Sequence, residues 1–111
     1  MDSGVIVAGG SDAPCFSFNW REGVQFAVTR VTATGQAIRP DLSMKLEDAI
    51  RMYTIESAKQ ECLENVRGSI EVNKVADFQM LERDIFECPK NEIGKIPVVM
   101  TICAGKIVYE A

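Results

Sequence analysis

The fold class is decided by the stretch VVMTICAGKIVY, which occupies positions 98–109. Its apolar and β-branched residues predict two strands, over residues 98–103 and 106–109. The dipeptide Ala104-Gly105 between them predicts a tight hairpin, because glycine tolerates the positive φ that such a turn requires. A further strand is predicted over residues 76–82. The C-terminal part of the chain is therefore expected to form an antiparallel hairpin or meander.

Two helices are expected before this sheet. The first is predicted over residues 20–31, with Asn19 as N-cap and Glu22 completing a capping box. The second is predicted to follow Ser43, another N-cap candidate, and to run to residue 62 or 63. Apolar residues at helical spacing predict the core-facing side of each helix. They are Trp20, Val24, Ala27, Val28 and Val31 in the first helix, and Leu46, Ile50, Tyr53 and Ala58 in the second.

The chain begins with another strand candidate, in the stretch VIVAGGSDAP at positions 5–14. Residues 4–9 are predicted to form a strand that is apolar on both faces, as the central strands of parallel sheets are. No later segment offers it an evident parallel neighbour with a helical crossover. The whole sequence therefore predicts an α+β fold with one leading strand, two helices and the C-terminal hairpin or meander, in a single domain over residues 1–111.

Composition and charge exclude several classes of partner. The chain has 111 residues, of which 16 are acidic and 12 basic, and its formal net charge is −4. The basic residues form no cluster, so neither nucleic acid nor a membrane surface is an expected partner. The longest strongly apolar stretch, residues 96–103, is too short to span a bilayer. No basic segment precedes an apolar one at the N-terminus, so no signal peptide is expected.

The four cysteines indicate a reducing compartment. Cys15, Cys62, Cys88 and Cys103 form no C-x-x-C pair, and the chain contains no histidine. A zinc knuckle is therefore not expected. We expect reduced, partly buried thiols in a cytoplasmic protein.

Asp12 is the candidate functional residue, because it follows two glycines at the end of the predicted leading strand. A lone carboxylate serves as a metal ligand or proton acceptor only where imidazoles or other ligands converge on it. Either those ligands lie on polypeptide outside this chain, or the chain does not perform that chemistry. The structural alternative for Asp12 is a turn residue or a helix-start residue. Cys15 as a nucleophile is disfavoured, since no histidine is present to activate it.

The segment GSIEVNKVADF at positions 68–78 resembles the G-S-I-E-x-G-K-x-A-D signature near the C-terminus of the metal-dependent amidohydrolase superfamily. The segments at positions 46–54 and 101–110 resemble the helix before that signature and the closing hairpin after it. GSDAP at positions 10–14, followed by AVTR at positions 27–30, resembles more narrowly the amidohydrolase family 3 branch, which includes N-substituted formamide deformylases. The resemblance covers essentially the whole chain, with its motifs in the order of the family.

The resemblance implies an (α/β) barrel that carries zinc or another divalent metal at the C-terminal ends of its strands. Asp12 matches the aspartate that ends the last barrel strand, where the family's residue touches the metal. That residue accepts a proton from the water that attacks a non-peptide C–N bond. Residues 1–63 would then supply the last barrel strand and the helices. Residues 64–111 would supply part of the small β-sandwich that the family builds from both chain termini.

The chain also departs from the family pattern. Such a barrel needs about 250 residues, and every histidine ligand is absent, so no cofactor is expected in the isolated chain. Asn73 replaces a usual glycine, and asparagine tolerates left-handed φ. Gln79 interrupts a usually apolar strand, which indicates a solvent-facing or edge position. Asp77 is expected to accept backbone or turn hydrogen bonds, and residues 69–72 are expected to form a short strand or an extended turn.

Two hypotheses of different class follow. The first is that the chain is the C-terminal part of a metal-dependent hydrolase acting on non-peptide C–N bonds, and that the isolated chain has no turnover. The alternative is a non-catalytic, self-associating interaction module derived from that fold, because an unpaired apolar strand favours association. The expected partner is accordingly a second copy of the chain or the missing barrel.

Overall fold

The first helix, α1, spans Trp20–Thr29 and begins at the predicted cap. The computed structural model describes residues 4–111. The side chain of Asn19 accepts a hydrogen bond from the Arg21 backbone N–H at 3.2 Å. Its amide nitrogen donates to the Glu22 carboxylate at 3.1 Å, whereas the Asn19 backbone N–H donates to the Ser17 hydroxyl at 3.1 Å. The predicted N-cap is therefore confirmed, but the reciprocal backbone bonds of a capping box are not formed. The helix ends before the predicted residue 31, because Arg30 adopts a left-handed conformation with φ 57°.

The second predicted helix is divided into two. Helix α2 spans Leu46–Met52 and helix α3 spans Ile55–Gln60. The prediction of one continuous helix after Ser43 was therefore wrong. Thr54 leaves the helical region at φ −129° and ψ −101°, and its hydroxyl donates to the Ile50 carbonyl at 2.9 Å. Threonine hydroxyls compete in this way with the helical hydrogen bonds of the backbone.

The core lies between the helices and a 3₁₀-helix, η2, that spans Lys90–Lys95. Helix η2 packs along α1, and Ile93 is completely buried there. Gln25 accepts a hydrogen bond from the Gly94 backbone N–H at 2.9 Å, which ties the two helices together. Val24 and Val28 are buried as predicted, whereas Val31 is exposed. The buried core cluster consists of Val24, Val28, Ala49, Ile85, Ile93 and Ile96.

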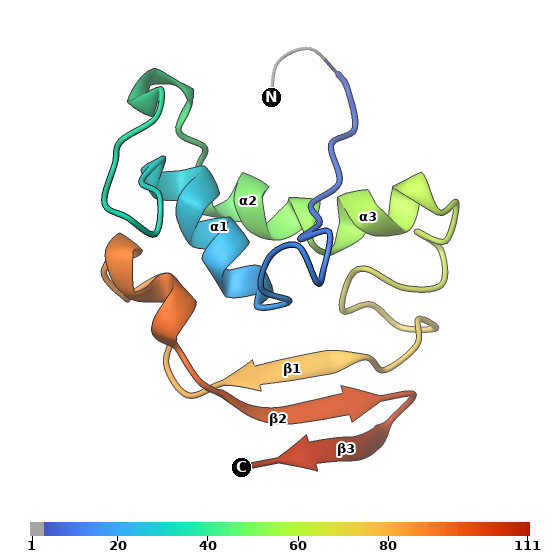
Figure 1. Cartoon of the computed structure of the whole chain (residues 1–111). Coiled ribbons are helices and arrows are strands. Elements are labelled where there is room, and N and C mark those ends of the chain that lie inside the picture. Colours follow the sequence, from blue (N-terminus) through green and yellow to red (C-terminus); the bar gives the residue numbers. More distant parts are fainter. Residues whose placement is uncertain (1–3) are drawn as a thin grey trace.

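The sheet is a three-stranded antiparallel meander that lies below the helices in Figure 1, with strand order β1-β2-β3. Strand β1 spans Phe78–Leu81, β2 spans Val98–Cys103 and β3 spans Lys106–Glu110. Ala104 and Gly105 connect β2 to β3 with φ angles of 48° and 76°. The predicted two-residue hairpin is therefore confirmed, as is the α+β class.

The predicted leading strand is absent. Residues 4–9 have no strand structure, and Val5, Ile6 and Val7 are exposed. The physical reason is that a strand is stabilised by the hydrogen bonds of its neighbours, and no strand within residues 4–111 pairs with this segment. Residues 69–72 form an extended turn, the second of the two alternatives given above.

A second 3₁₀-helix, η1, spans Pro40–Leu42 in the connection between α1 and α2. None of the helices formed by residues 4–111 has the length and apolar character needed to cross a bilayer.

Candidate functional site

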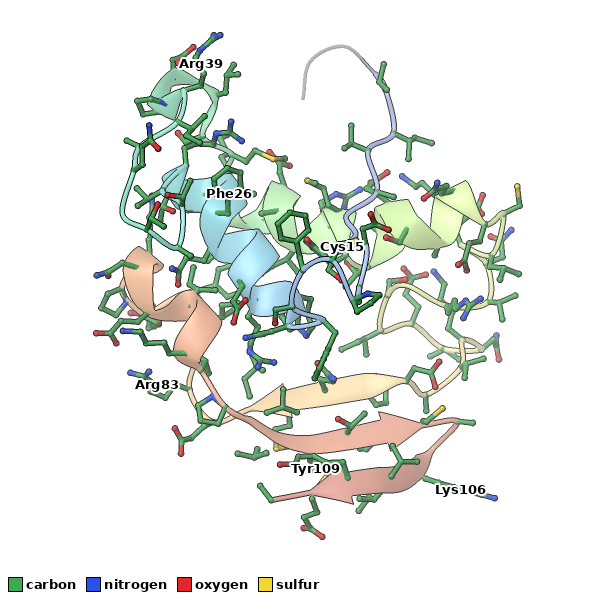
Figure 2. The ribbon with its side chains drawn as sticks, in the orientation of Figure 1. Cys15, Phe26, Arg39, Arg83, Lys106 and Tyr109 are labelled. Atoms are coloured by element: carbon green, nitrogen blue, oxygen red, sulfur yellow. The ribbon has the colours of Figure 1, made fainter. Side chains whose placement is uncertain are left out.

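Asp12 lies in an exposed turn ahead of α1. Its backbone is left-handed, with φ 51°, and its carbonyl accepts a hydrogen bond from the Cys15 N–H at 2.9 Å. Figure 2 labels Cys15 on the loop that leads from this turn into α1. Aspartate tolerates this backbone conformation better than most residues, so the local structure agrees with the turn interpretation of Asp12.

The residues near Asp12 do not fit a bound metal ion. Within residues 4–111, no three His, Cys, Asp or Glu side chains lie close enough to share an ion. A catalytic zinc site needs three protein ligands. The Asp12 carboxylate is therefore accessible to solvent, but residues 4–111 supply no further ligands with which it could retain a metal ion.

Tyr53 lies where the N-terminal segment crosses the helices, at the end of α2. The Gly9 N–H donates to the Met52 carbonyl at 2.8 Å. A Cβ atom at Gly9 would lie 2.7–2.9 Å from three carbons of the Tyr53 ring. A Cβ atom at Gly23, in the middle of α1, would overlap the Tyr53 hydroxyl. We call this arrangement the Gly9–Tyr53–Gly23 contact. Burial raises the pKa of the Tyr53 hydroxyl.

Trp20 connects this contact to the sheet. Its ring centroid lies 6.4 Å from that of Tyr53, with the ring planes at 43°. Its indole Nε1–H donates to Gln79 Oε1 on β1 at 2.7 Å. Strand β1 is an edge strand and Gln79 is exposed, so the predicted edge position is confirmed. Gln79 thus links the sheet to α1.

Two adjoining open grooves separate the helices from the sheet. Their volumes are about 480 and 540 Å³. Tyr53, Thr54, Asp77, Phe78 and Gln79 line both of them. No group of metal-ligating side chains lies in either groove within the described part of the chain, so the grooves offer space without an evident catalytic constellation.

The signature segment at positions 68–78 is structural. Asn73 is left-handed at φ 74°, as its replacement of glycine predicts. Lys74 donates to the Ser69 hydroxyl at 2.5 Å, which closes the turn. Asp77 accepts a hydrogen bond from the Ala104 N–H at 2.7 Å. The prediction that Asp77 accepts backbone or turn hydrogen bonds is therefore confirmed, because the donor is a backbone N–H in the hairpin turn. This bond joins the signature to the hairpin.

The cysteines are more accessible than predicted. Cys15, Cys62 and Cys103 are exposed and Cys88 is half-buried, and all four are free thiols. No histidine exists in the sequence to activate any of them. None of the four cysteines is paired in a disulfide within the described part of the chain.

The chain is similar to known proteins over nearly its whole length. Its sequence matches the model of the Amidohydrolase family over residues 1–109. This chain belongs to the amidohydrolase family. The resemblance found in the signature, helix and hairpin motifs is thereby confirmed.

Among relatives of this amidohydrolase chain, the N-substituted formamide deformylase of Arthrobacter pascens is 36% identical over 110 residues, which are 99% of this chain and 20% of that protein. The putative amidohydrolase YtcJ of Bacillus subtilis is 32% identical over 113 residues, covering 99% of this chain and 21% of that protein. The crystal structure of an amidohydrolase from Thermotoga maritima matches with a TM-score of 0.70 and 26% identity, over 97% of this chain and 24% of that one. The chain thus spans about a fifth of the length of its curated relatives.

Tyr53 is predicted to face the core, whereas nothing in the local pattern around it predicts its contact with two glycines. The available signal was Gly23, because a glycine inside a helix is destabilising and often marks a close approach. Its neighbour in space, Gly9, is distant along the chain, so no local pattern joins the two.

Proposed function

We propose that this chain is the C-terminal part of a metal-dependent hydrolase acting on non-peptide C–N bonds, and that it has no turnover by itself. Two facts together carry the proposal: the chain matches the family, and within residues 4–111 no metal ligands are grouped around Asp12. The family match extends over residues 1–109, yet the described part of the chain groups no set of metal ligands around that carboxylate.

In this proposal Asp12 supplies a carboxylate to an active site that residues outside this chain complete. Its exposed position supports that role, because an accessible carboxylate can be reached by groups from another polypeptide segment. The four free thiols support a cytoplasmic location, since unpaired cysteines are usual in reducing compartments.

A chimeric enzyme tests the proposal. The segment of the Arthrobacter deformylase that matches this chain is replaced by residues 1–111, and hydrolysis of an N-substituted formamide is measured. We expect turnover by the chimera and none by the isolated chain with added zinc. Asp12→Asn should lower kcat of the chimera by about 10²–10⁴-fold, because it removes a proton acceptor.

The matched control is Asp41→Asn, which changes another exposed aspartate, in η1, and should leave kcat unchanged. Metal analysis of the isolated chain should find no stoichiometric zinc. Formamide hydrolysis or stoichiometric zinc in the isolated chain would contradict the proposal. Full activity of the chimera carrying Asp12→Asn would contradict the role of Asp12.

The second candidate is a self-associating interaction module, and exposed apolar side chains favour it. Ile6 is 53% exposed, Val5 63%, Phe16 75% and Phe18 89%. Val5 and Ile6 lie in the N-terminal segment that pairs with no strand within residues 4–111, and Phe16 and Phe18 lie in the loop between Asp12 and α1. Apolar side chains concentrated in this way often mark a contact surface.

Light scattering of the purified chain at tens of micromolar tests the module. Self-association predicts a dimer or a larger species, and Ile6→Ser together with Phe18→Ser should shift it towards the monomer. A monodisperse monomer with a cooperative thermal transition would exclude this candidate.

A further inference from the structure

The loop that carries Asp12 is held at its two ends. On one side, the Gly9 N–H bonds to the Met52 carbonyl at 2.8 Å. On the other side, the Asn19 side chain donates to the Gly94 carbonyl at 2.9 Å. Between them, residues 10–18 are mostly exposed, and the hydrogen bond from Cys15 to Asp12 is local to the turn. The place of Asp12 therefore depends on how these two ends are fixed.

The Tyr53 ring determines where the Gly9 end can lie. The backbone of Gly9 approaches the ring so closely that any side chain there would come within 2.9 Å of it. Gly23 approaches the same side chain from α1, close to the hydroxyl. Such distances are shorter than side-chain carbons normally reach, so both positions require glycine while Tyr53 is present.

Trp20, the first residue of α1, also lies beside the ring. Its centroid lies 6.4 Å from that of Tyr53, within the range of aromatic pairs that attract each other. The hydrogen bond to Gln79 fixes the indole in turn. Tyr53 is therefore confined between the N-terminal segment and α1, whose first residue, Trp20, is bonded to the sheet.

We propose that Tyr53 is a positioning residue: through the Gly9–Tyr53–Gly23 contact it sets the place of Gly9, and thereby that of Asp12 three residues later. The consequence for catalysis rests on the proposed function of Asp12, whereas the contact itself does not. The contact depends on the aromatic ring. Phenylalanine at position 53 should therefore preserve the contact, and leucine should remove it.

NMR of the isolated chain tests the contact without any measurement of activity. The Hα protons of Gly9 and Gly23 should show ring-current shifts that vanish in Tyr53→Leu and persist in Tyr53→Phe. Gly35→Ala, a strained substitution in an open turn after α1, should lower stability but leave both shifts unchanged. Shifts that persist in Tyr53→Leu would refute the contact.

Neighbouring glycines provide a second, independent test. A Cβ atom at Gly10 would meet nothing within 4 Å, unlike one at Gly9. Gly9→Ala should therefore displace the Tyr53 ring signals, and Gly10→Ala should not. In a Tyr53→Leu background, Gly9→Ala should have little further effect, because the ring that it would strike is gone. Equal effects of Gly9→Ala in both backgrounds would refute the proposal.

The chimera described above tests the catalytic consequence. Tyr53→Leu should lower kcat by about a hundredfold with little change in KM, since a displacement of about 1 Å is enough to cost that much. Tyr53→Phe should restore kcat. If Asp12→Asn abolishes turnover while Tyr53→Leu leaves kcat intact, the positioning role is wrong and the proposed function stands. If Asp12→Asn has no effect, the proposed function fails, and the NMR experiment alone decides the contact.

Discussion

At the scale of single residues, Glu56 is the charged residue that is buried within residues 4–111. It lies in α3 and is 8% exposed. Arg51 donates to its carboxylate at 2.6 Å and Lys59 at 3.1 Å. Arg51 belongs to α2, so the carboxylate joins the two helices across their break at Thr54. A buried carboxylate is costly unless it is paired in this way.

These partners predict a pH dependence of stability. Hydrogen bonds from Lys59 and Arg51 lower the pKa of Glu56 below its ordinary value of 4.5. The ionised carboxylate therefore stabilises the fold above about pH 4.5, and this contribution is lost as the pH falls through the lower folded pKa. Urea unfolding midpoints measured down to about pH 3 should fall with pH.

The Glu56→Gln variant should show a smaller loss of stability over the same range than the wild type. Glu87→Gln, which alters an exposed carboxylate, should follow the wild-type curve. A Glu56→Gln curve parallel to that of the wild type would show that Glu56 does not contribute to the acid sensitivity.

At the scale of elements, Gly68 lets the signature segment pack closely against α3. Its φ is +95°, and an added Cβ atom would lie 2.7 Å from the Cβ of Ala58 and 3.0 Å from the Cα of Ile55. Both the left-handed backbone and the close approach to the helix exclude a side chain. The turn can thus follow α3 only with glycine at this position.

Three glycine-to-alanine variants separate these two causes. Gly68→Ala should destabilise the chain by about 2–4 kcal/mol, because strain and overlap add. Gly35→Ala should cost about 1 kcal/mol, since φ is +84° there but the space is open. Gly10→Ala, in open space without a left-handed backbone, should change stability by less than about 0.5 kcal/mol.

Unfolding free energies from urea titrations give the three values. Equal losses for Gly68→Ala and Gly35→Ala would mean that packing against α3 contributes nothing at Gly68.

At the scale of the whole molecule, the helical core is buried from solvent and the sheet is largely exposed to it. The buried residues belong to the helices and to the segment around η2, while no residue of the three strands is buried. Strand β3 is exposed along its entire length. Figure 2 shows Lys106 and Tyr109 on this outermost strand, remote from the helices. The chain is therefore a helical core with a sheet attached at one side.

This arrangement predicts unequal protection from hydrogen exchange. Regions with few buried contacts open locally, without global unfolding. Amide protons of β3 should therefore exchange roughly a hundredfold faster than those of Val24 and Val28 in α1. Strand β2, which is bonded on both sides, provides the internal comparison. Equal protection of β3 and α1 would show that the sheet unfolds only together with the core.

Features that depend on neighbouring residues could be predicted from the sequence alone. Ala104 and Gly105 form the hairpin turn, Asn19 caps α1, and Asn73 adopts the left-handed conformation. In each case the deciding interaction is a backbone preference or a hydrogen bond within a few residues. The α+β class and the family followed from such local motifs in their order.

The tertiary structure decided what depends on distant partners. Residues 5–7 carry a strand-forming sequence but form no strand, because no neighbouring strand pairs with them within residues 4–111. Gly9, Gly23 and Tyr53 meet only once the helices have packed. Hydrogen bonds between strands and close contacts between side chains require both partners in space. Local sequence patterns relate residues that are near one another along the chain. The contacts around Asp12 join residues that are far apart in the sequence, so only the folded structure shows them.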